Sequence, residues 1–538
     1  MKKRAILFFV LMNGIFYSTF ALDKIGIEFY KFGQFELAKT ILLNQYQNAE
    51  GADKAIISYY LGEIYFKEEK RDSAAFYFNI GLASNPEYVF NEIGMAKLQF
   101  KEAPALAEAA LKKIANKNKK KADVFVGIAK AYFDNGKKEA AFEAIENAKK
   151  INNKYGEAYV LAGDIYMAEQ NHNKASSAYG QALNLDKQCK EAYLRYANIY
   201  ATVNAALAIQ TLEELVALDP SSPLAQKTIA EAYYANKQFD KAVAAYSNYA
   251  ASEYCSPSDL TVYTAILFFS GNYEKSTEYA AAAVKANPND FVMNRLLMYN
   301  YFEQKKYEEG LAVAEKFMSL QGTQKQAFTS TDYLYYARLL QKNKQADAAI
   351  PQFKKVLELD SSAVSVYKEI IDIYEAKGDY DNAIANYNIY IKDERSNARI
   401  NDYLALGRFN YLAGVAIKDK DDNSMQKRTH YLMEADTLFG YVAEKVPDNF
   451  AGNFWRARTN VALDPETEQG LAKPYYEAAL TLMDPAKDVK QIIECYQYFG
   501  SYYVRVKEDK ATSKSYWNKI LELDPNNDSA IRALKLLK

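Results

Sequence analysis

Histidine, cysteine and the residues that interrupt helices are scarce in this chain of 538 residues, which has 2 histidines, 3 cysteines, 12 prolines and 22 glycines. Cys189, Cys255 and Cys495 form no CxxC motif, so they predict lone buried thiols rather than a disulfide framework. His172 and His430 lack the HExxH spacing of a zinc site. The small number of prolines and glycines indicates long helices joined by short turns.

An excess of charge of either sign is also missing, because 67 lysines and arginines are balanced by 68 aspartates and glutamates. This balance gives no whole-chain footprint for nucleic acid or an anionic membrane. One local basic run, Lys112–Lys121, has no interleaved aromatic residues. We interpret it as solvated surface rather than as a nucleic-acid site, and we expect no nucleic-acid partner.

Long apolar runs are absent except at the N-terminus. There a basic start, Lys2–Arg4, precedes the run Ala5–Tyr17, and Thr19 and Ala21 are small residues at the positions that signal peptidase reads. An uncleaved anchor is the alternative, but the run is shorter than the ~20 apolar residues that a spanning helix needs. We therefore predict a secretory signal over residues 1–21, an exported product, and no integral membrane span after cleavage.

A repeated pattern of small and large residues is present instead. The segment Ser58–Pro86 reads SYYLGEIYFKEEKRDSAAFYFNIGLASNP. Its Gly62 allows two helices to approach closely, Ala74 lies where their backbones cross, and Phe78 fills the space beside them. Between Ala74 and Gly310 the small residue returns at steps of 33 or 34 residues, and four residues after it a large apolar residue usually follows. The crossing positions are Ala38, Ala74, Ala107, Ala141, Ala175, Ala208, Ala242, Ser276, Gly310, Ala349, Ala383, Ala435, Ala472 and Ser513.

These residues resemble the tetratricopeptide repeat (TPR) family over essentially the whole mature length, in about fourteen units. The motif residues of the clearest unit are Leu61, Gly62, Tyr65, Ala74, Phe78 and Pro86. The resemblance implies an all-α fold, a right-handed α-solenoid of antiparallel helix pairs whose first helices line a concave surface. Residues 528–538 are expected to form a capping helix, with Ile531, Leu534, Leu536 and Leu537 covering the last repeat.

Two breaks in the period suggest the domain organisation. The polar stretch Ser319–Asp332 predicts a boundary between a sub-array of about nine repeats, residues 22–320, and one of about five, residues 330–538. A second insertion surrounds Ile417–His430. We expect a loop there, either solvated and mobile or in contact with a partner.

No catalytic, cofactor or metal motif accompanies the repeats. The phosphate-binding GxxxxGK[ST], the dinucleotide-binding GxGxxG and the nucleophile motif GxSxG are all missing. Nearly every residue after the N-terminal segment is assigned to a repeat, which leaves no room for an enzymatic domain. We therefore predict a chain that is not an enzyme, with no catalytic residues, no cofactor and no metal site.

First-helix positions away from the packing stripe supply candidate protein-binding residues, because arginine and tyrosine combine broad apolar surface with directional donors. The alternative is that Tyr299, Phe302 and Tyr411 only pack between neighbouring helices. Near the tryptophan Trp455, FWRARTNVAL is a predicted first helix and LAKPYYEAAL a second helix, joined by the enlarged turn DPETEQG. The predicted contact residues are Arg295, Tyr299, Phe302, Arg338, Lys368, Arg408, Tyr411, Arg456 and Arg458.

The functional hypothesis is a scaffold or adaptor that binds a protein or peptide on the concave surface. A clamp for a C-terminal carboxylate is not supported, because Glu231 and Asp372 stand where asparagine is needed after Lys227 and Lys368. The alternative is a protein that binds or processes envelope glycans, since exposed tyrosines stack on sugars. The Lys/Asn/Tyr-rich sequence is similar to that of exported TPR proteins of Bacteroidota, which implies the periplasm or the periplasmic face of an envelope complex. The sequence leaves the oligomeric state open.

Overall fold

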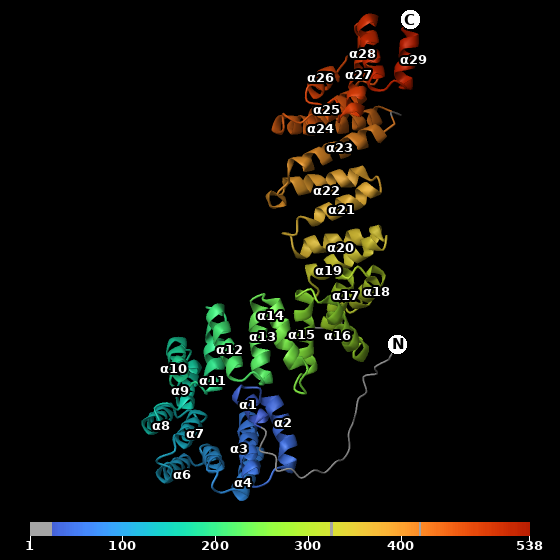
Figure 1. Cartoon of the computed structure of the whole chain (residues 1–538). Coiled ribbons are helices and arrows are strands. Elements are labelled where there is room, and N and C mark those ends of the chain that lie inside the picture. The colour runs from blue at the N-terminus through green and yellow to red at the C-terminus, as the bar shows by residue number, and fades with distance from the viewer. Residues whose placement is uncertain (1–23, 323–326, 419–420, 538) are drawn as a thin grey trace. The chain divides into compact units, whose positions relative to one another are not determined.

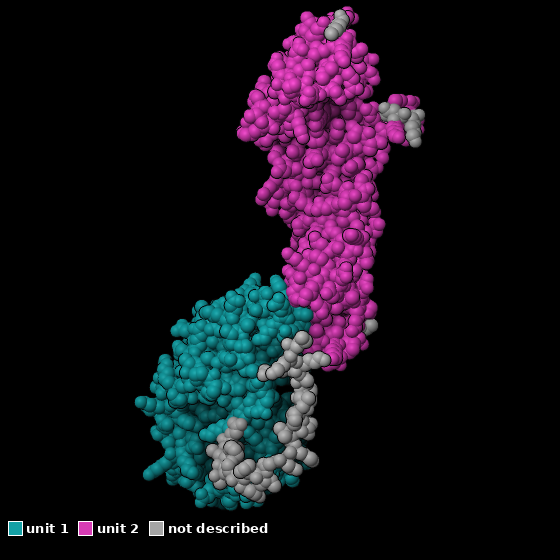
Figure 2. Space-filling view, turned by 45° about the vertical axis from the view of Figure 1, so that its right-hand side comes forward, with its two compact units in different colours: residues 1–279 teal, residues 280–538 magenta. Residues whose placement is uncertain are grey.

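The computed structural model describes residues 24–322, 327–418 and 421–537 (Figure 1). The predicted signal peptide lies outside these residues. In the described part of the chain all regular structure is helical, with 29 α-helices and one short 3-10 helix, η1 (Glu394–Ser396), and no strand. The chain forms two compact units, residues 1–279 and residues 280–538 (Figure 2). This division falls inside the helix Tyr273–Ala286, and the sub-array boundary at Ser319–Asp332 stays a prediction.

Unit 1 consists of consecutive helix pairs, in which each first helix packs against the second helix that follows it. The first helices are α1 (Ile25–Lys31), α3 (Gly51–Lys67), α5 (Phe90–Gln99), α7 (Ala122–Phe133), α9 (Gly156–Ala168), α11 (Lys190–Tyr200), α13 (Pro223–Ala235) and α15 (Pro257–Phe269). The second helices are α2 (Phe35–Asn48), α4 (Arg71–Ser84), α6 (Pro104–Lys117), α8 (Lys138–Ile151), α10 (His172–Leu185), α12 (Ala205–Leu218), α14 (Phe239–Ala250) and α16 (Tyr273–Ala286), which ends inside unit 2.

Unit 2 continues the same order of helices. Its first helices are α17 (Phe291–Glu303), α19 (Ser330–Lys342), α21 (Val366–Ala376), α23 (Ile400–Ala416), α25 (Ala451–Leu463) and α27 (Val489–Arg505). Its second helices are α18 (Tyr307–Met318), α20 (Ala346–Leu359), α22 (Tyr380–Lys392), α24 (Asp422–Lys445), α26 (Lys473–Leu480) and α28 (Lys510–Leu523), and α29 (Asp528–Leu536) follows. The prediction of an all-α solenoid of helix pairs is confirmed.

The small and large residues of the repeat pattern form the contacts inside each pair. Ala74 and Phe78 are both completely buried. A Cβ atom on Gly62 of α3 would lie 2.4 Å from the Phe78 ring of α4. Gly163 and Tyr179 have the same relationship, at 2.3 Å. Glycine is therefore required where the aromatic residue of the second helix presses on the first helix.

The insertion after α23 is not the loop that we expected. Only residues 417 to 421 separate α23 from α24, and Asp422–His430 belongs to a second helix of 24 residues. The carboxylate of Asp421 accepts the backbone N–H of Ser424 at 2.8 Å, which starts the helix earlier than the repeat requires. Lys427 and Tyr431 then hydrogen-bond to Asp381 of α22, each at 2.8 Å, and anchor the added turns.

The C-terminal segment covers the last pair, with one correction. Leu537 and Ala530 are buried against Trp517 and Ile520 of α28. Leu536, which we expected in this contact, is 87% exposed. Its position on a short amphipathic helix places it on the side opposite the apolar stripe.

Two smaller predictions concern the cysteines and the turn between α25 and α26. All three cysteines are free; Cys189 and Cys495 are buried, but Cys255 is only partly buried. The predicted turn DPETEQG between α25 and α26 is organised by Asp464, in place of a helix-start cap. Its buried carboxylate instead accepts the backbone N–H groups of Glu468 and Gly470, both at 2.8 Å.

Candidate functional site

The first helices of unit 1 surround a hollow of about 380 Å³. Its walls come from α1, α3, α5, α7, α9 and α11, the helices expected to line a concave surface. Aromatic and charged side chains alternate around it. The aromatic lining is Tyr30, Phe35, Tyr59, Tyr60, Tyr88, Phe90 and Tyr155, and the charged lining is Lys31, Lys67, Asp123, Lys130, Glu157, Asp164, Glu191 and Arg195.

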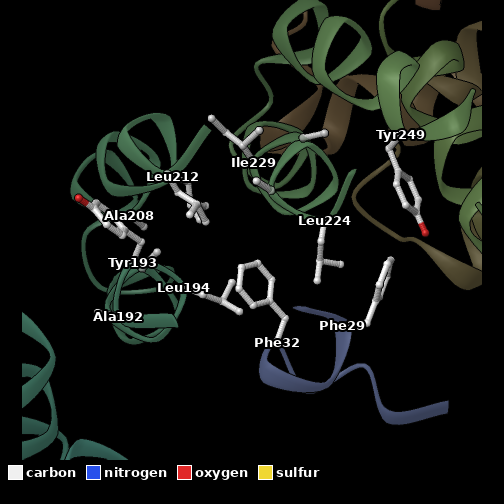
Figure 3. Close-up of a cluster of buried hydrophobic side chains, with 14 of the residues drawn as sticks. Phe29, Phe32, Ala192, Tyr193, Leu194, Ala208, Leu212, Leu224, Ile229 and Tyr249 are labelled. Carbon is white, nitrogen blue, oxygen red and sulfur yellow. The ribbon is translucent and has the colours of Figure 1, made fainter. Parts of the chain in front are cut away.

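Helix α1 closes this hollow by packing against helices far away in the sequence. Phe29 is completely buried and Phe32 is 7% exposed. Figure 3 shows Phe32 beside Leu194 of α11, while Phe29 faces Leu224 of α13. These residues belong to one apolar cluster, so burial of the two phenylalanines holds the first helix of unit 1 against its sixth and seventh pairs.

Charged contacts also hold α1 in this position. The ammonium group of Lys31 lies 2.6 Å from a Glu157 oxygen and 2.7 Å from a Glu191 oxygen. Burial alone would lower the pKa of Lys31, but the two carboxylates outweigh it and raise the pKa. On the other side of α1, Glu28 accepts a hydrogen bond from the Ser222 hydroxyl and lies 3.5 Å from the Lys190 ammonium. The closure therefore combines apolar burial with specific ion pairs.

A buried charge cluster lies under the hollow. Glu63 of α3, 2% exposed, lies 2.7 Å from the Lys97 ammonium and 2.8 Å from the Lys130 ammonium. Lys97 also pairs with Asp134 at 2.7 Å. Burial would raise the pKa of Glu63, but Lys130 and Lys97 outweigh it and hold the pKa below its usual value. The Tyr30 hydroxyl donates to Glu63 at 3.2 Å, which joins α1 to this cluster.

Two charged groups in the hollow are left without an ion pair among the described residues: Lys67 of α3 and Asp123 of α7. The walls around Lys67 remove water from its ammonium group and lower its pKa, and repulsion by Lys130 adds to the effect. Tyr60 and Tyr88 also face the hollow, and burial raises the pKa of both hydroxyls. The hollow thus offers one cation, one anion and neutral hydroxyl donors to a ligand.

The sequence-predicted contact residues lie in unit 2, where most of them form bonds between successive first helices. The Arg295 guanidinium of α17 pairs with Asp332 of α19, and Arg338 of α19 pairs with Glu369 of α21 at 2.6 Å. The Tyr299 hydroxyl donates to Asp332 at 2.7 Å. The remaining pairs of this ladder are Lys368 with Asp402, at 2.8 Å, and Arg458 with Glu494, at 2.7 Å.

The predicted aromatic residues pack between neighbouring helices. The rings of Tyr299 and Tyr335 stack at 4.1 Å between centroids, and Phe302 meets Tyr335 edge-on at 5.2 Å. Tyr411 of α23 meets Trp455 of α25 edge-on at 5.6 Å. This is the packing role that the sequence left as an alternative. Contact with a partner stays a prediction for these residues.

Lys368 and Arg408 of the predicted set line a common pocket, a space of about 270 Å³ between α21, α22 and α23. Arg408 has an exposed side chain and no ion pair among the described residues, and its guanidinium lies 5.4 Å from the Trp455 ring centre. Asp372 faces the same pocket, where burial and then the neighbouring Glu375 raise its pKa. Arg408 is therefore the predicted arginine best placed to meet a ligand.

Arg456 and Arg458 lie on either side of Ala457 and form bonds with different helices. Arg456 forms two hydrogen bonds with Asp436 of α24, at 3.1 and 2.9 Å. Arg458 forms two with Glu494 of α27, at 2.8 and 2.7 Å. Both guanidinium groups are thus engaged in bonds between helices.

Other kinds of site find little support in the described residues. No group of three or more histidine, cysteine, aspartate or glutamate side chains in that part of the chain is arranged to hold a metal ion. Over the same residues, no helix combines the length and apolar character that crossing a bilayer requires.

The helix pairs and their lined hollow define the class of protein, an α-solenoid, and family models identify its repeats. Residues 122–155 and 156–189 match one tetratricopeptide repeat model, and residues 204–259 and 337–409 match another. The chain therefore contains tetratricopeptide repeats. The matching models indicate neither an enzymatic nor a carbohydrate-binding family. No curated protein matches the chain.

Several solved structures are similar over part of the chain. The C-terminal part of a TPR repeat-containing protein from Cytophaga hutchinsonii is 28% identical, covers 51% of this chain and 99% of its own, and has a TM-score of 0.38. A tetratricopeptide repeat protein from Parabacteroides merdae is 16% identical, covers 47% and 98%, and has a TM-score of 0.30. A thermophilic TPR protein from Thermus thermophilus is 19% identical, covers 34% and 99%, and has a TM-score of 0.26.

Sequence reasoning directed attention to the arginines of unit 2 and missed the hollow of unit 1. A signal for it exists in the first helices of the N-terminal repeats. A lysine lies in the last turn of each of the first four first helices, at Lys31, Lys67, Lys97 and Lys130. A regular column of lysines on one side of a solenoid indicates a charged lining rather than separate surface residues.

Proposed function

We propose that this chain is a non-enzymatic TPR scaffold that binds a segment of another protein in the hollow of unit 1. The observation that carries the proposal is the pairing of a tyrosine-rich lining with Lys67 and Asp123, which have no ion pair among the described residues. Every other charged group that lines the hollow already forms an ion pair within the protein. An unpaired cation and an unpaired anion in a closed hollow fit a partner that carries both charges.

A polypeptide segment meets these requirements well. Its side chains present both signs of charge, and its backbone carbonyl groups accept hydrogen bonds from the neutral hydroxyls of Tyr60 and Tyr88. Tyrosine supplies large contact area at a low entropic cost, because it has few rotatable bonds. The volume of about 380 Å³ accommodates a few side chains rather than a folded domain. The pre-formed hollow also limits the ordering cost of binding.

The cell envelope is the proposed location. The basic start and apolar run of residues 1–21 support it, because they have the order of a secretory signal. Both Cytophaga hutchinsonii and Parabacteroides merdae, the sources of two similar structures, are Bacteroidota, in keeping with the resemblance of the sequence. The intact mass of the protein recovered from an envelope fraction tests the export proposal, since cleavage near residue 21 removes the N-terminal segment.

Site-specific photo-cross-linking in envelope preparations tests the binding proposal. A cross-linking amino acid replaces Tyr88 in the hollow, and the control replaces Tyr441, which is 37% exposed on the second helix α24. We expect defined adducts from position 88 and none of the same mass from position 441. Lys67→Glu should remove these adducts, whereas Lys316→Glu, on the exposed side of α18, should leave them unchanged. Adducts that survive Lys67→Glu would show that the hollow is not the binding site.

The pocket of unit 2 is a further proposed contact surface. The structure decides which arginine can be substituted to test it. Reversing Arg295 or Arg338 breaks the ladder between first helices, so loss of a partner would not identify a contact. Arg408→Glu changes charge in the pocket without breaking an ion pair among the described residues. Retention of all envelope partners by Arg408→Glu would exclude this pocket.

A further inference from the structure

A second, larger groove lies in unit 1 between the second helices α6 and α8. It encloses about 810 Å³. Small side chains, among them Ala109 of α6 and Ala144 of α8, form its walls, and Phe125, Ile128 and Tyr132 of α7 form its floor. An apolar floor between alanine walls leaves room for a bulky element to lie between the two helices.

The groove exists because α6 packs against its partner α5 far more than against the following helix α7. The large residues of α6 that point inward, Leu111 and Ile114, are completely buried. Apart from Leu111, the residues of α6 that line the groove are alanine, glutamate, lysine or asparagine, and they do not fill the space toward α8. The side chains of α7 are thus left partly exposed at the bottom, as shown by the half-buried Phe125 and Tyr132.

The two ends of the groove carry opposite charge. Glu108 and Glu143 lie in the first halves of α6 and α8, and both carboxylates add to the raised pKa of Tyr132, which is due first to burial. Lys112, Lys119 and Lys150 line the other end. The basic run extends this end with Lys113, Lys117, Lys120 and Lys121, and these seven lysines form no ion pair with any residue that the structure describes.

We propose that this groove binds an amphipathic helix of a partner protein, with acidic residues at the end that faces Lys112, Lys119 and Lys150. The apolar stripe of that helix packs on Phe125, Ile128 and Tyr132, and a basic residue at its other end meets Glu108 and Glu143. This is helix-in-groove recognition, in which residues at i, i+3 or i+4, and i+7 supply the anchors. The basic run, interpreted from sequence as solvated surface, becomes one half of a charge-complementary site.

The dimensions set the size of the partner. Helices α6 and α8 each have 14 residues and run in the same direction as second helices of successive repeats. They are about 21 Å long, so the groove matches a partner helix of about four turns. A helix that begins with glutamate or aspartate has the acidic end that its own dipole favours. No residue that lines this groove also lines the hollow, so the proposal does not depend on binding there.

Fluorescence anisotropy with the full mature chain tests the proposal directly. The probe is a labelled 16-residue helical peptide with leucine at i, i+3, i+7 and i+10, glutamates in its first turn and lysines in its last turn. The control peptide has the same composition with the two charged ends exchanged. We expect saturable binding of the probe and at least about tenfold weaker binding of the control, because several charge pairs change sign together.

Two variants separate the groove from general charge attraction. Ala109→Trp fills the groove from an exposed wall position and should abolish binding while the fold is kept. Lys112→Glu combined with Lys150→Glu should weaken binding of the probe and strengthen binding of the control peptide. No saturable probe binding, equal affinity for both peptides, or undiminished binding to Ala109→Trp would each overturn the proposal. So would tight binding of vesicles containing phosphatidylglycerol that competes with the peptide, because the basic end would then face a membrane.

Discussion

The guanidinium group of Arg295 forms two hydrogen bonds of 2.8 Å with the carboxylate of Asp332, a residue with no solvent exposure. Asp332 also accepts the backbone N–H of Thr329 at 2.7 Å and so completes the capping box of α19. One carboxylate thus caps a helix and joins it to the preceding first helix. Asp259 and Asp402 have the same double role toward Lys227 and Lys368.

Arg295→Ala should therefore lower the stability of unit 2 by about 2–3 kcal/mol, because it leaves a buried carboxylate with fewer charge-assisted hydrogen bonds. Urea unfolding followed by circular dichroism measures this change. The control is Arg408→Ala, which removes an exposed guanidinium outside the ladder and should change stability by less than about 0.5 kcal/mol. Equal effects of the two variants would show that the ladder contributes nothing specific.

Gly62 and Gly180 should respond in opposite directions to replacement by alanine. An alanine Cβ at position 62 would lie 2.4 Å from the Phe78 ring, so α3 and α4 must separate, and we expect a loss of about 1–3 kcal/mol. At position 180 the nearest atom lies at 3.4 Å, so Gly180→Ala should gain up to about 1 kcal/mol from helix propensity. Thermal unfolding of both variants provides the measurement, and a stabilising Gly62→Ala would contradict the close approach of the two helices.

The fold was predictable from the sequence because each repeat depends on local spacing. The crossing residues Ala38, Ala74 and Ala107 are completely buried, and so are Leu42 and Phe78, which follow four residues later. A period of about 34 residues carries this information without any knowledge of distant contacts. The spacing changes where local chemistry lengthens an element, as the cap at Asp421 does for α24.

The candidate site was less predictable, because it depends on contacts that no period encodes. Lys31 and Glu157 are 126 residues apart in the sequence, yet they close the hollow of unit 1. In unit 2 the ladder uses Arg295, Arg338 and Arg458, three of the arginines that the sequence selects as contact residues. An arginine on a first helix has the same sequence signature whether its partner is Asp332 or a ligand. Only the three-dimensional pairing separates Arg295 from Arg408.

Phe32→Ala should open the hollow without unfolding the repeats around it. Phe32 is 7% exposed in the cluster that holds α1 against α11 and α13, and truncating a buried phenylalanine costs about 3–5 kcal/mol. We expect faster hydrogen exchange in Ile25–Lys31 and unchanged exchange in α19. The control is Phe76→Ala, at a position 57% exposed on α4, and it should leave hydrogen exchange in both segments unchanged. Unchanged protection of α1 in Phe32→Ala would mean that the ion pairs alone maintain the closure.

Glu63 should make unit 1 sensitive to acid. Its pKa in the folded state lies below the usual value, because Lys130 and Lys97 outweigh the effect of burial. A carboxyl group whose pKa is lowered by folding stabilises the fold above its unfolded pKa of about 4.3, and this contribution is lost as the pH falls below that value.

Glu63→Gln should therefore destabilise unit 1 by about 3 kcal/mol at pH 7, where it leaves the ammonium group of Lys130 without its carboxylate. The difference in the free energy of unfolding between Glu63→Gln and the natural protein should shrink steadily below about pH 4, where Glu63 itself becomes protonated on unfolding. Urea unfolding at a series of pH values between 3 and 7 measures both quantities. Glu139→Gln, at an exposed position of α8, is the control, and its stability should depend on pH in the same way as that of the natural protein. A Glu63→Gln difference that is independent of pH would assign the destabilisation to packing rather than to charge.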